Sequence, residues 1–278
     1  MFPHICGVSS QETLLGPACA DGDPVKIVSY NLRFASEADP QPWSRRRPAS
    51  VELLSGLAPD ILGTEEGVDH QLADLMDGLG DHYRLVAEHR HDGGIEENSA
   101  IIYNSRAVEL IKIEHQWLST TPDVPGSISW GATLPRMYSL ASFRRVADDA
   151  EFFVITTHFD HESIEVQVNS AHQVIDRIAG LDPDVPLIVM GDFNCGEDSE
   201  PYAIMTAGQL RDAYLTAAER GPRLGTFNNY AAPDPDGVRI DWILVSDRVT
   251  VSSARMVDEA PGGQYPSDHL PVEAVIDF

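Results

Sequence analysis

The sequence predicts an α+β protein in which two β-sheets pack face to face with helices outside them. Strand-like and helix-like segments are mixed along the chain, without the strict alternation that is typical of a parallel α/β fold. The strand-like segments are short and apolar, and in both halves of the chain several of them end or begin with acidic or amide side chains. Apolar sheets bury their faces best against each other, so this pattern predicts a sandwich.

Two strands and two helices are predicted in the first part of the chain. Val25–Tyr30 and Asp60–Thr64 are short apolar runs and predict strands. Between them, Ser44–Leu57 has helical character, and Pro48 is tolerated only near the start of a helix. Val68–Leu79 follows as a helix because its apolar residues recur at helical spacing.

Strands dominate the remainder. Ser163–Leu181 predicts a long helix with one apolar face, and Ser199–Ala207 predicts a short one. The loop 120–135 is rich in proline and glycine and long enough to suggest a role at a site. The predicted strands, in order, are Tyr83–Ala87, Ser99–Tyr103, Val108–Ile113, Met137–Phe143, Phe152–Thr157, Pro186–Met190, Val238–Val245, Val249–Met256 and Val272–Ile276.

The charge balance limits the possible substrates. With 44 Asp and Glu against 19 Lys and Arg, the net charge is −25. The densest basic run, Arg45–Arg47, is expected to be a solvated helix start, so no basic stripe for tracking nucleic acid is visible. Tight nonspecific binding to long nucleic acid is therefore disfavoured. Attack on a single phosphate is not, because a bound divalent cation can reverse the local charge.

The N-terminal residues 1–24 are expected to form a flexible segment ahead of a single domain, 25–278. They lack the basic start and apolar stretch of a signal peptide, and nothing in the chain has the length and hydropathy of a membrane span. Of the three cysteines, Cys6 and Cys19 could pair, although free thiols in a reducing compartment fit better. We therefore predict a cytoplasmic protein.

Polar residues follow or precede many of the predicted strands. They are Asn31, Glu66, His158, Asp192, Asn194, Asp241, Asp268 and His269. Oxygen ligands without thiolates suit a hard ion such as Mg2+ or Mn2+, and two histidines suit proton transfer. Each residue alone could be an ordinary turn or capping residue, but turn chemistry does not require all of them at successive strand ends.

Six motifs in sequence order resemble the endonuclease/exonuclease/phosphatase superfamily, which includes deoxyribonuclease I, exonuclease III and the inositol polyphosphate 5-phosphatases. The resemblance implies a four-layer α/β sandwich over 25–278. Within the superfamily, the sequence is most similar to small stand-alone bacterial members. The motifs are Ser29–Arg33, Asp60–Glu66, Thr157–Asp160, Gly191–Asn194, Arg239–Ile243 and Ser267–Pro271.

The resemblance implies a metal site and a general base. Glu66 would be the principal Mg2+ ligand, with Asn31 and Asp268 nearby in the metal and phosphate shell, and Mn2+ is a possible substitute. Asp192 would align and deprotonate the attacking water. Asn194 would hold that water or a phosphate oxygen.

The resemblance further implies donors around the phosphate. His269 would donate to the phosphoryl oxygen that gains charge, with Asp241 holding its ring and favouring the protonated form. His158 would lie near the leaving oxygen as a donor or general acid. Arg136 would clamp the phosphate with its two-pronged guanidinium, and Asn98 would add a further donor.

Some positions depart from similar sequences. Glu65 stands where many relatives have Gln, and Gln167 replaces a common basic residue. Arg33 stands where exonuclease III-like enzymes carry an acid implicated in a second metal site, which disfavours a two-metal scheme. His161 is expected to be a solvated helix-entry residue. Aromatic residues that could either pack or form a stacking wall are Trp117, Trp130, Phe227 and Tyr230.

These expectations favour an enzyme: a Mg2+-dependent phosphoesterase acting on a small phosphorylated molecule such as a nucleotide, sugar phosphate or inositol phosphate. The alternative is a metal-dependent nuclease acting on DNA or RNA. An inactive binding module is a third hypothesis, disfavoured because Asp192 and His269 are both present. No membrane or protein partner is implied. Substrate identity, ester type, the choice between Mg2+ and Mn2+, and oligomeric state stay open.

Overall fold

The computed structural model describes residues 23–91 and 97–278. The strands are β1 (Val25–Asn31), β2 (Ile61–Val68), β3 (Tyr83–His89), β4 (Glu97–Asn104), β5 (Val108–Trp117), β6 (Met137–Arg145), β7 (Glu151–His158), β8 (Leu187–Asp192), β9 (Leu210–Asp212), β10 (Glu219–Arg220), β11 (Asp241–Ser246), β12 (Thr250–Met256) and β13 (Val272–Asp277). The helices are α1 (Trp43–Leu57), α2 (Asp69–Leu79), α3 (Ile164–Ala179), α4 (Glu200–Thr206), α5 (Ala213–Thr216) and the 3-10 helix η1 (Pro261–Gly263).

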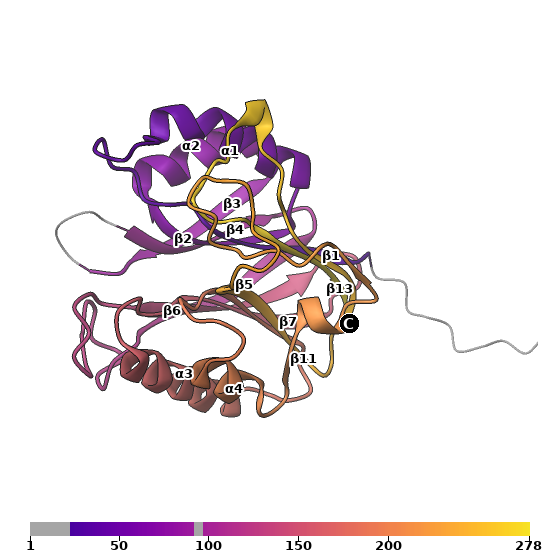
Figure 1. Cartoon of the computed structure of the whole chain (residues 1–278). Coiled ribbons are helices and arrows are strands. Elements are labelled where there is room, and N and C mark those ends of the chain that lie inside the picture. The colour runs from indigo at the N-terminus through magenta and orange to yellow at the C-terminus, as the bar shows by residue number, and fades with distance from the viewer. Residues whose placement is uncertain (1–22, 92–96) are drawn as a thin grey trace, which may run out of the picture.

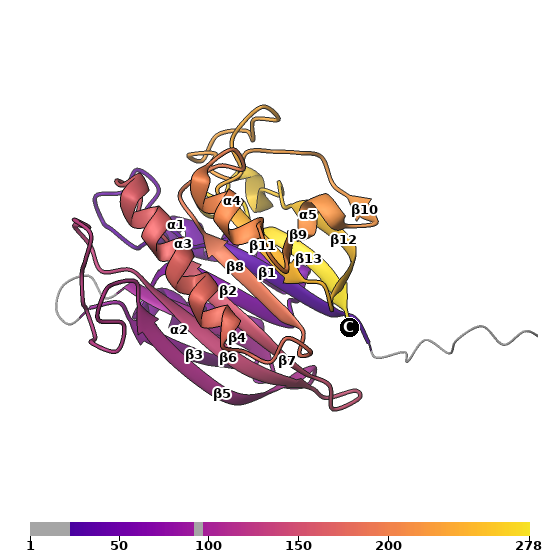
Figure 2. The ribbon, with the colours of Figure 1, turned by 90° about the horizontal axis from the view of Figure 1, so that it is seen from below.

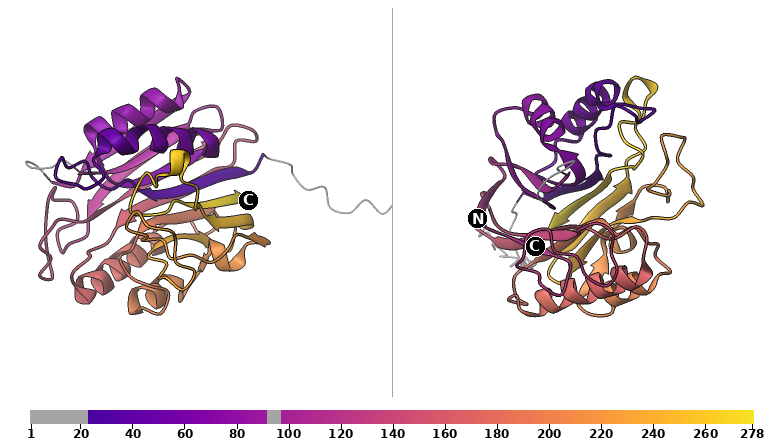
Figure 3. Two further views of the ribbon diagram at one scale, coloured as in Figure 1. Left: turned by 45° about the horizontal axis from the view of Figure 1, so that its top comes forward. Right: turned by 90° about the vertical axis from the view of Figure 1, so that its left-hand side faces the viewer.

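The strands form two mixed sheets that pack against each other (Figure 1). One has the order β10-β12-β13-β1-β2-β4-β3, and the other has the order β5-β6-β7-β8-β11-β9. Helices α1 and α2 cover the outer face of the first sheet, and α3 and α4 cover that of the second, as the views in Figures 2 and 3 also show. The predicted four-layer sandwich is therefore confirmed.

Apolar side chains fill the three spaces between these four layers. In β1, Ile27 enters the core between the sheets, whereas Val28 packs toward α1 and α2. In β8, Ile188 and Val189 divide in the same way between the inter-sheet core and α3. Successive strand side chains point to opposite faces, so a strand buried on both faces has an uninterrupted apolar run.

Several boundaries differ from the predicted ones. β5 extends to Trp117, because β6 supplies pairing partners as far as that residue. β11 begins at Asp241 rather than Val238, and the short elements β9, β10 and α5 were not expected. Pro48 lies inside α1, beyond its first turn, where it removes one helical hydrogen bond. Three-residue strands such as β9 depend on a neighbouring strand, and that neighbour is not visible locally in the sequence.

Arg46 corrects the expectation that the basic run is solvated. Its side chain is fully buried, at 0% exposure. The guanidinium donates to the carbonyl oxygens of Leu32 at 2.7 Å, Arg33 at 2.9 Å, Gln41 at 2.7 Å and Pro266 at 3.0 Å. Arg46 thus ties the chain after β1 to the segment that leads into Asp268.

The predicted leading segment falls almost wholly outside the described residues, as do Cys6 and Cys19. Cys195 is buried and has a free thiol. Across 23–91 and 97–278, no helix has the length and apolar character needed to cross a membrane.

Candidate active site

The sheet topology gathers the predicted strand-end residues at one edge of the sandwich. β7 and β8 are parallel neighbours, and their pairing places His158 beside Asp192. β11 runs antiparallel to β8, so its first residue, Asp241, lies opposite Asp192. In the other sheet β1 and β2 are parallel, which brings Asn31 and Glu66 together at their ends.

The segment before β13 completes the group. β13 runs antiparallel to β1, so the chain enters it beside the end of β1. This places Asp268 and His269 at the same edge, where the Ser267 hydroxyl donates to the Asn31 carbonyl at 2.7 Å. Residues separated by more than two hundred positions thereby share one site.

Local backbone geometry directs the side chains of two acids, Asp192 and Glu66, toward the cavity. Gly191 has a φ of +152°, and a Cβ there would lie 1.9 Å from the Thr157 carbonyl oxygen, so only glycine allows β8 to approach β7 this closely. Glu66 has a φ of +61°, where the pairing of β2 with β4 shifts register between Thr64 and Gly67. A bulge of this kind redirects side chains, here into the cavity.

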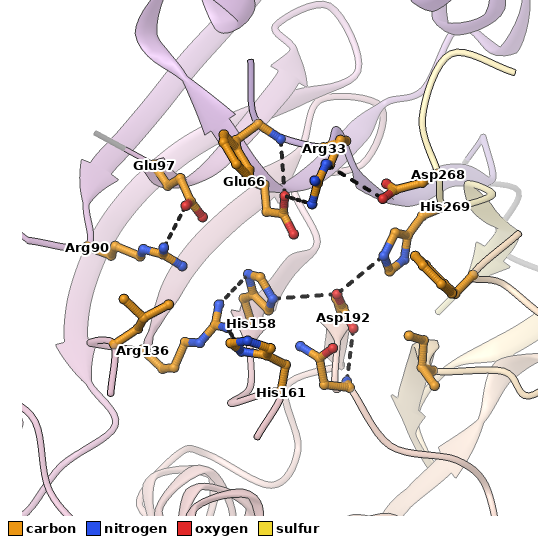
Figure 4. A pocket seen from close by; sticks show the side chains of 15 residues that line it. Arg33, Glu66, Arg90, Glu97, Arg136, His158, His161, Asp192, Asp268 and His269 are labelled. Carbon is orange, nitrogen blue, oxygen red and sulfur yellow. Dashed lines mark hydrogen bonds and ion pairs between the residues drawn. The ribbon is translucent and has the colours of Figure 1, made fainter. Parts of the chain in front are cut away.

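A cavity of about 370 Å³ opens at this edge (Figure 4). His269 and Asp268 lie at one end, and Arg90 and Arg136 lie at the other. The residues that line it are Arg33, Phe34, Glu66, Arg90, Glu97, Leu134, Arg136, His158, His161, Asp192, Asn194, Phe227, Ile240, Asp268 and His269. The loop 120–135 contributes Leu134 to this wall.

Asp192 lies at the centre of the polar groups. Its Oδ2 accepts a hydrogen bond from Asn31 Nδ2 at 2.9 Å, and its Oδ1 accepts from the Asn194 N–H at 2.9 Å. Burial, reinforced by the negative charge of Asp241, raises the pKa of Asp192 to about 7. A carboxyl group with this pKa is suited to accept a proton near neutral pH.

His269 is held by Asp241. Its Nδ1–H donates to Asp241 Oδ2 at 2.9 Å, and its Nε2 lies 3.9 Å from Asp192 Oδ2. Burial alone would lower the pKa of His269, but Asp241 and Asp192 together raise it well above its usual value. This environment favours the imidazolium form of His269, which can donate to an anionic oxygen.

His158 has the opposite character. Its Nε2 lies 3.5 Å from Asp192 Oδ2, and its Nδ1 accepts from Arg136 Nη1 at 2.9 Å. Burial, followed by the positive charges of Arg136 and Arg90, lowers the pKa of His158 well below its usual value. The ring is neutral, so it can donate a hydrogen bond but is a poor source of a proton for a leaving group.

Glu66 is an acidic group at the cavity whose surroundings favour its ionised form. Burial alone would raise its pKa, but the hydrogen bond from Asn31 at 3.0 Å, with the charge of His269, lowers it. Glu66, His158 and Asp192 each offer a ligand atom within 4.8 Å of the others. An ionised carboxylate among further oxygens that line a cavity is the donor set of a divalent cation.

Asn31 is placed differently from the expected ligand. Its amide nitrogen donates to Glu66 and Asp192, while its Oδ1 accepts from the Arg33 N–H at 2.9 Å. In this arrangement Asn31 joins the two carboxylates as a donor, and it would have to turn its amide to ligate a cation. The Arg33 guanidinium lies 3.7 Å from Asp268 and 3.9 Å from Glu66, between the two acids.

Asn98 is not brought to the cavity wall that faces Asp192. Its amide nitrogen donates to the Gly67 carbonyl at 3.0 Å and to Asp69 Oδ1 at 3.1 Å. Both amide hydrogens are thereby engaged, so this geometry does not offer them to a phosphate. Instead, Asn98 braces the chain just after Glu66. Arg136, in contrast, lines the cavity, and its contact with a phosphate stays a prediction.

The sequence did not identify Arg90, Glu97 and His161 as residues that line the cavity. Arg90 Nη2 pairs with Glu97 Oε1 at 2.6 Å, and burial raises the pKa of Glu97 to about 7. His161, expected in solvent, lines the cavity and accepts from Arg136 Nη2 at 3.0 Å. His161 could have been found from its position three residues after His158, which ends β7 at the cavity. Arg90 and Glu97 lie in no motif.

Gln167 supports the site from behind. It is buried and donates from Nε2 to the carbonyl oxygens of Asp160 at 2.8 Å and Asn194 at 3.1 Å. It therefore holds the turn that carries Asn194. Among the aromatic residues considered for a stacking wall, Phe227 lines the cavity and is 52% exposed, whereas Trp117 is buried.

This fold and this set of side chains define a hydrolase that acts on phosphoesters. The family model described as the Endonuclease/Exonuclease/phosphatase family matches residues 28–269, and the chain belongs to that family. The match runs from Val28, within β1, to His269, so it includes every predicted site residue and ends just before β13.

Solved structures and one curated protein are similar to the chain. A mannosyl-6-phosphatase of Bacteroides thetaiotaomicron is 32% identical, with a TM-score of 0.85 over 91% of this chain and 100% of that one. Protein angel of Drosophila melanogaster is 26% identical over 264 residues, 84% of this chain and 72% of that protein. The human Nocturnin catalytic domain with bound sulfate is 20% identical, with a TM-score of 0.71 over 92% of this chain and 94% of that one, and shares the fold.

Proposed function

We propose that the protein is a Mg2+-dependent phosphoesterase that hydrolyses a phosphate ester of a small molecule. The observation that carries this proposal is the position of Asp192, a buried carboxyl with a pKa of about 7, between the neutral His158 and the charged His269. A base between two donors is the arrangement that in-line attack of water on phosphorus requires.

Glu66 and Asp268 would hold the cation, with Asn31 positioning both Glu66 and Asp192. When bound, Mg2+ neutralises a nonbridging phosphate oxygen and makes the phosphorus more electrophilic. Oxygen donors favour Mg2+, and Mn2+ fits the same ligands. Arg33 brings a positive charge, in place of a further acid, to 3.9 Å from Glu66 and 3.7 Å from Asp268, which supports one metal ion rather than two.

The other side chains of the site have separate roles in the reaction. Asp192 takes the proton from the attacking water, which the Asn194 side chain helps to place. His269, kept charged by Asp241, donates to the phosphoryl oxygen on which negative charge accumulates. His158 donates through Nε2–H near the leaving oxygen. Asn98 acts through the Glu66 segment rather than on the phosphate.

Two observations support a small substrate. The net charge of −25 opposes a long polyanion, and the cavity is bounded at one end by Arg90 and Arg136. The similarity to a mannosyl-6-phosphatase supports a sugar phosphate in particular. Nucleotides and inositol phosphates fit the same chemistry.

A nuclease is the second candidate, favoured by Phe227. This half-exposed ring lies at the cavity, edge-on to His269 with centroids 5.1 Å apart, and offers a face on which a nucleobase could stack.

We further propose that 25–278 act as one catalytic unit. The cytoplasmic location stays a prediction.

The test is hydrolysis of a substrate panel by purified full-length protein with Mg2+ and with EDTA, read as phosphate release for the small esters and as strand cleavage on gels for the nucleic acids. The panel contains hexose 6-phosphates, nucleotides, inositol phosphates, and single- and double-stranded DNA and RNA. We expect turnover of at least one small ester, lost in EDTA and in Asp192→Asn. Turnover of nucleic acid alone would favour the nuclease, and inactivity on the whole panel would contradict both proposals.

A further inference from the structure

We propose that Arg136 is a positioning residue that locks His158 and His161 in the Nε2–H tautomer and thereby keeps the His158 nitrogens out of the metal shell. The inference deepens the proposed function and rests on its assignment of a cation to Glu66. It explains how a centre that contains a histidine can still present only oxygen atoms to the ion.

The first step is the direction of two hydrogen bonds. Arg136 Nη1 lies 2.9 Å from His158 Nδ1, and Arg136 Nη2 lies 3.0 Å from His161 Nδ1 (Figure 4). A guanidinium has five N–H donors and no acceptor, so both Nδ1 atoms must be the acceptors. A neutral imidazole that accepts at Nδ1 carries its proton on Nε2.

The second step is the rigidity of Arg136. The residue is only 4% exposed and directly precedes β6. Its carbonyl oxygen accepts from the Leu118 N–H at 2.7 Å, which anchors the backbone to the end of β5. A buried guanidinium presents its N–H groups in a rigid planar fork, so it can fix two rings in one geometry.

The third step concerns metal ligation. Glu66, His158 and Asp192 present ligand atoms within 4.8 Å of one another, a carboxylate and imidazole set that suits Zn2+ as well as other ions. An imidazole ligates through a lone pair. In His158 the Nδ1 lone pair is taken by Arg136, and Nε2, which faces Asp192, carries the proton. The ring therefore cannot join the shell while Arg136 is in place.

The ring of His269 has a partner of the opposite charge, the Asp241 carboxylate. Its Nδ1–H donates to a carboxylate, Asp241, instead of accepting from a cation. The two histidines beside Asp192 thus have partners of opposite charge, and only the partner of His158 makes Nδ1 an acceptor.

The direct test is the tautomeric state, read from long-range 1H–15N correlation spectra of the imidazoles in metal-free and Mg2+-loaded full-length protein. Signals are assigned with His158→Gln and His161→Gln. We expect unprotonated Nδ1 and protonated Nε2 in both rings, and a shift of His158 toward mixed tautomers in Arg136→Met. Protonated Nδ1 in the wild type, or unchanged rings in Arg136→Met, would overturn the proposal.

Arg90→Met is the matched control, because it removes the same charge from the same end of the cavity without touching either ring. Its tautomers should match the wild type, and equal shifts in both variants would overturn a specific role for Arg136. If Arg136→Met does not fold, Arg136→Gln takes its place. The shorter Gln amide cannot occupy the positions of both Nη atoms, so both rings unchanged in that variant would also count against the proposal.

The second readout is Zn2+ affinity, measured by chelator competition. Arg136→Met should bind Zn2+ at least about 10-fold more tightly than the wild type, the scale of outer-shell effects on metal sites. The gain should disappear in the double variant that adds His158→Gln. No gain, or a gain that survives that addition, would contradict the proposal. Neither readout needs turnover, so inactivity on every ester would remove the proposed function while leaving these results interpretable.

Discussion

His158 Nε2 and His269 Nε2 both approach one oxygen, Asp192 Oδ2, at 3.5 Å and 3.9 Å (Figure 4). Both side chains are imidazoles, but their favoured protonation states differ. Burial and the charge of Arg136 lower the pKa of His158 and favour its neutral form, whereas Asp241 and Asp192 raise the pKa of His269 and favour its protonated form. The partner behind each ring therefore decides its chemistry, and Asp192 lies between a neutral donor and a cationic one.

Asp192→Asn should lower kcat by at least about 10²-fold, because an amide cannot accept the proton of the attacking water. Steady-state kinetics on the best substrate of the panel, with circular dichroism to check folding, provides the measurement. Asp198→Asn, which changes an exposed carboxylate six residues further along, should retain wild-type kcat. Equal activity in the two variants would remove Asp192 from its assigned role.

The pH dependence should reveal the raised pKa of Asp192. Because only the ionised form accepts a proton, kcat/KM should rise with pH through about 7. The linked effect on stability has the opposite sign. A folded pKa above the unfolded value favours folding at low pH, and this contribution is lost as pH rises through about 7.

Denaturant unfolding of the metal-free protein measures that loss directly. Asp192→Asn has no titrating group at this position, so its stability should decline less than that of the wild type across the same pH range. Parallel stability curves for the two proteins would show that Asp192 ionises at an ordinary pH.

Glu66→Gln should weaken Mg2+ binding, because it removes the ionised carboxylate that points into the cavity. Mg2+ stabilises the folded state only as far as it binds, by about 2.7 kcal/mol at a hundred times Kd. Thermal melts should therefore show a Mg2+-dependent rise in Tm for the wild type and for the exposed control Glu52→Gln, and little rise for Glu66→Gln. A full rise in Glu66→Gln would place the cation elsewhere.

Arg46→Met should destabilise the protein by about 3–5 kcal/mol, because it leaves buried carbonyl oxygens without their charged donor. Arg45→Met, one residue away on an exposed position of α1, should change stability by less than about 0.5 kcal/mol. Urea unfolding of both variants gives the comparison. Similar values for the pair would mean that the buried hydrogen bonds contribute nothing net.

Phe227→Ala should raise KM for a ring-containing phosphate by roughly 10-fold with kcat little changed, because it removes apolar contact made equally in the ground and transition states. An acyclic ester such as glycerol 3-phosphate should lose much less. Ile164→Ala, an exposed apolar residue outside the cavity, serves as the control. An equal loss on cyclic and acyclic esters would argue against a ring-binding role for Phe227.

Most strands and helices could be predicted from the sequence because their signals are local. The apolar run before Gly191 and the helical spacing in 163–181 identify β8 and α3 without knowledge of their neighbours. The strand-end residues were found for the same reason, since polar groups stand out at the edge of an apolar run. Arg90, Glu97 and the burial of Arg46 were not found, because a single charged residue in a loop, strand or helix has no local sign that a cavity or a carbonyl cluster surrounds it.

By itself, the sequence determined the sandwich, the order of its main elements and the residues whose chemistry suits phosphate hydrolysis, because these follow from hydrophobic periodicity and residue type. Only the tertiary structure decided the protonation of those residues. Burial and partner charge shift the pKa values of Asp192 and His269, and the hydrogen bond from Arg136 makes His158 Nδ1 an acceptor. Each of these effects depends on atoms contributed by another part of the chain. Electrostatic energy depends on distances in space, and the spacing of residues along the chain does not contain them.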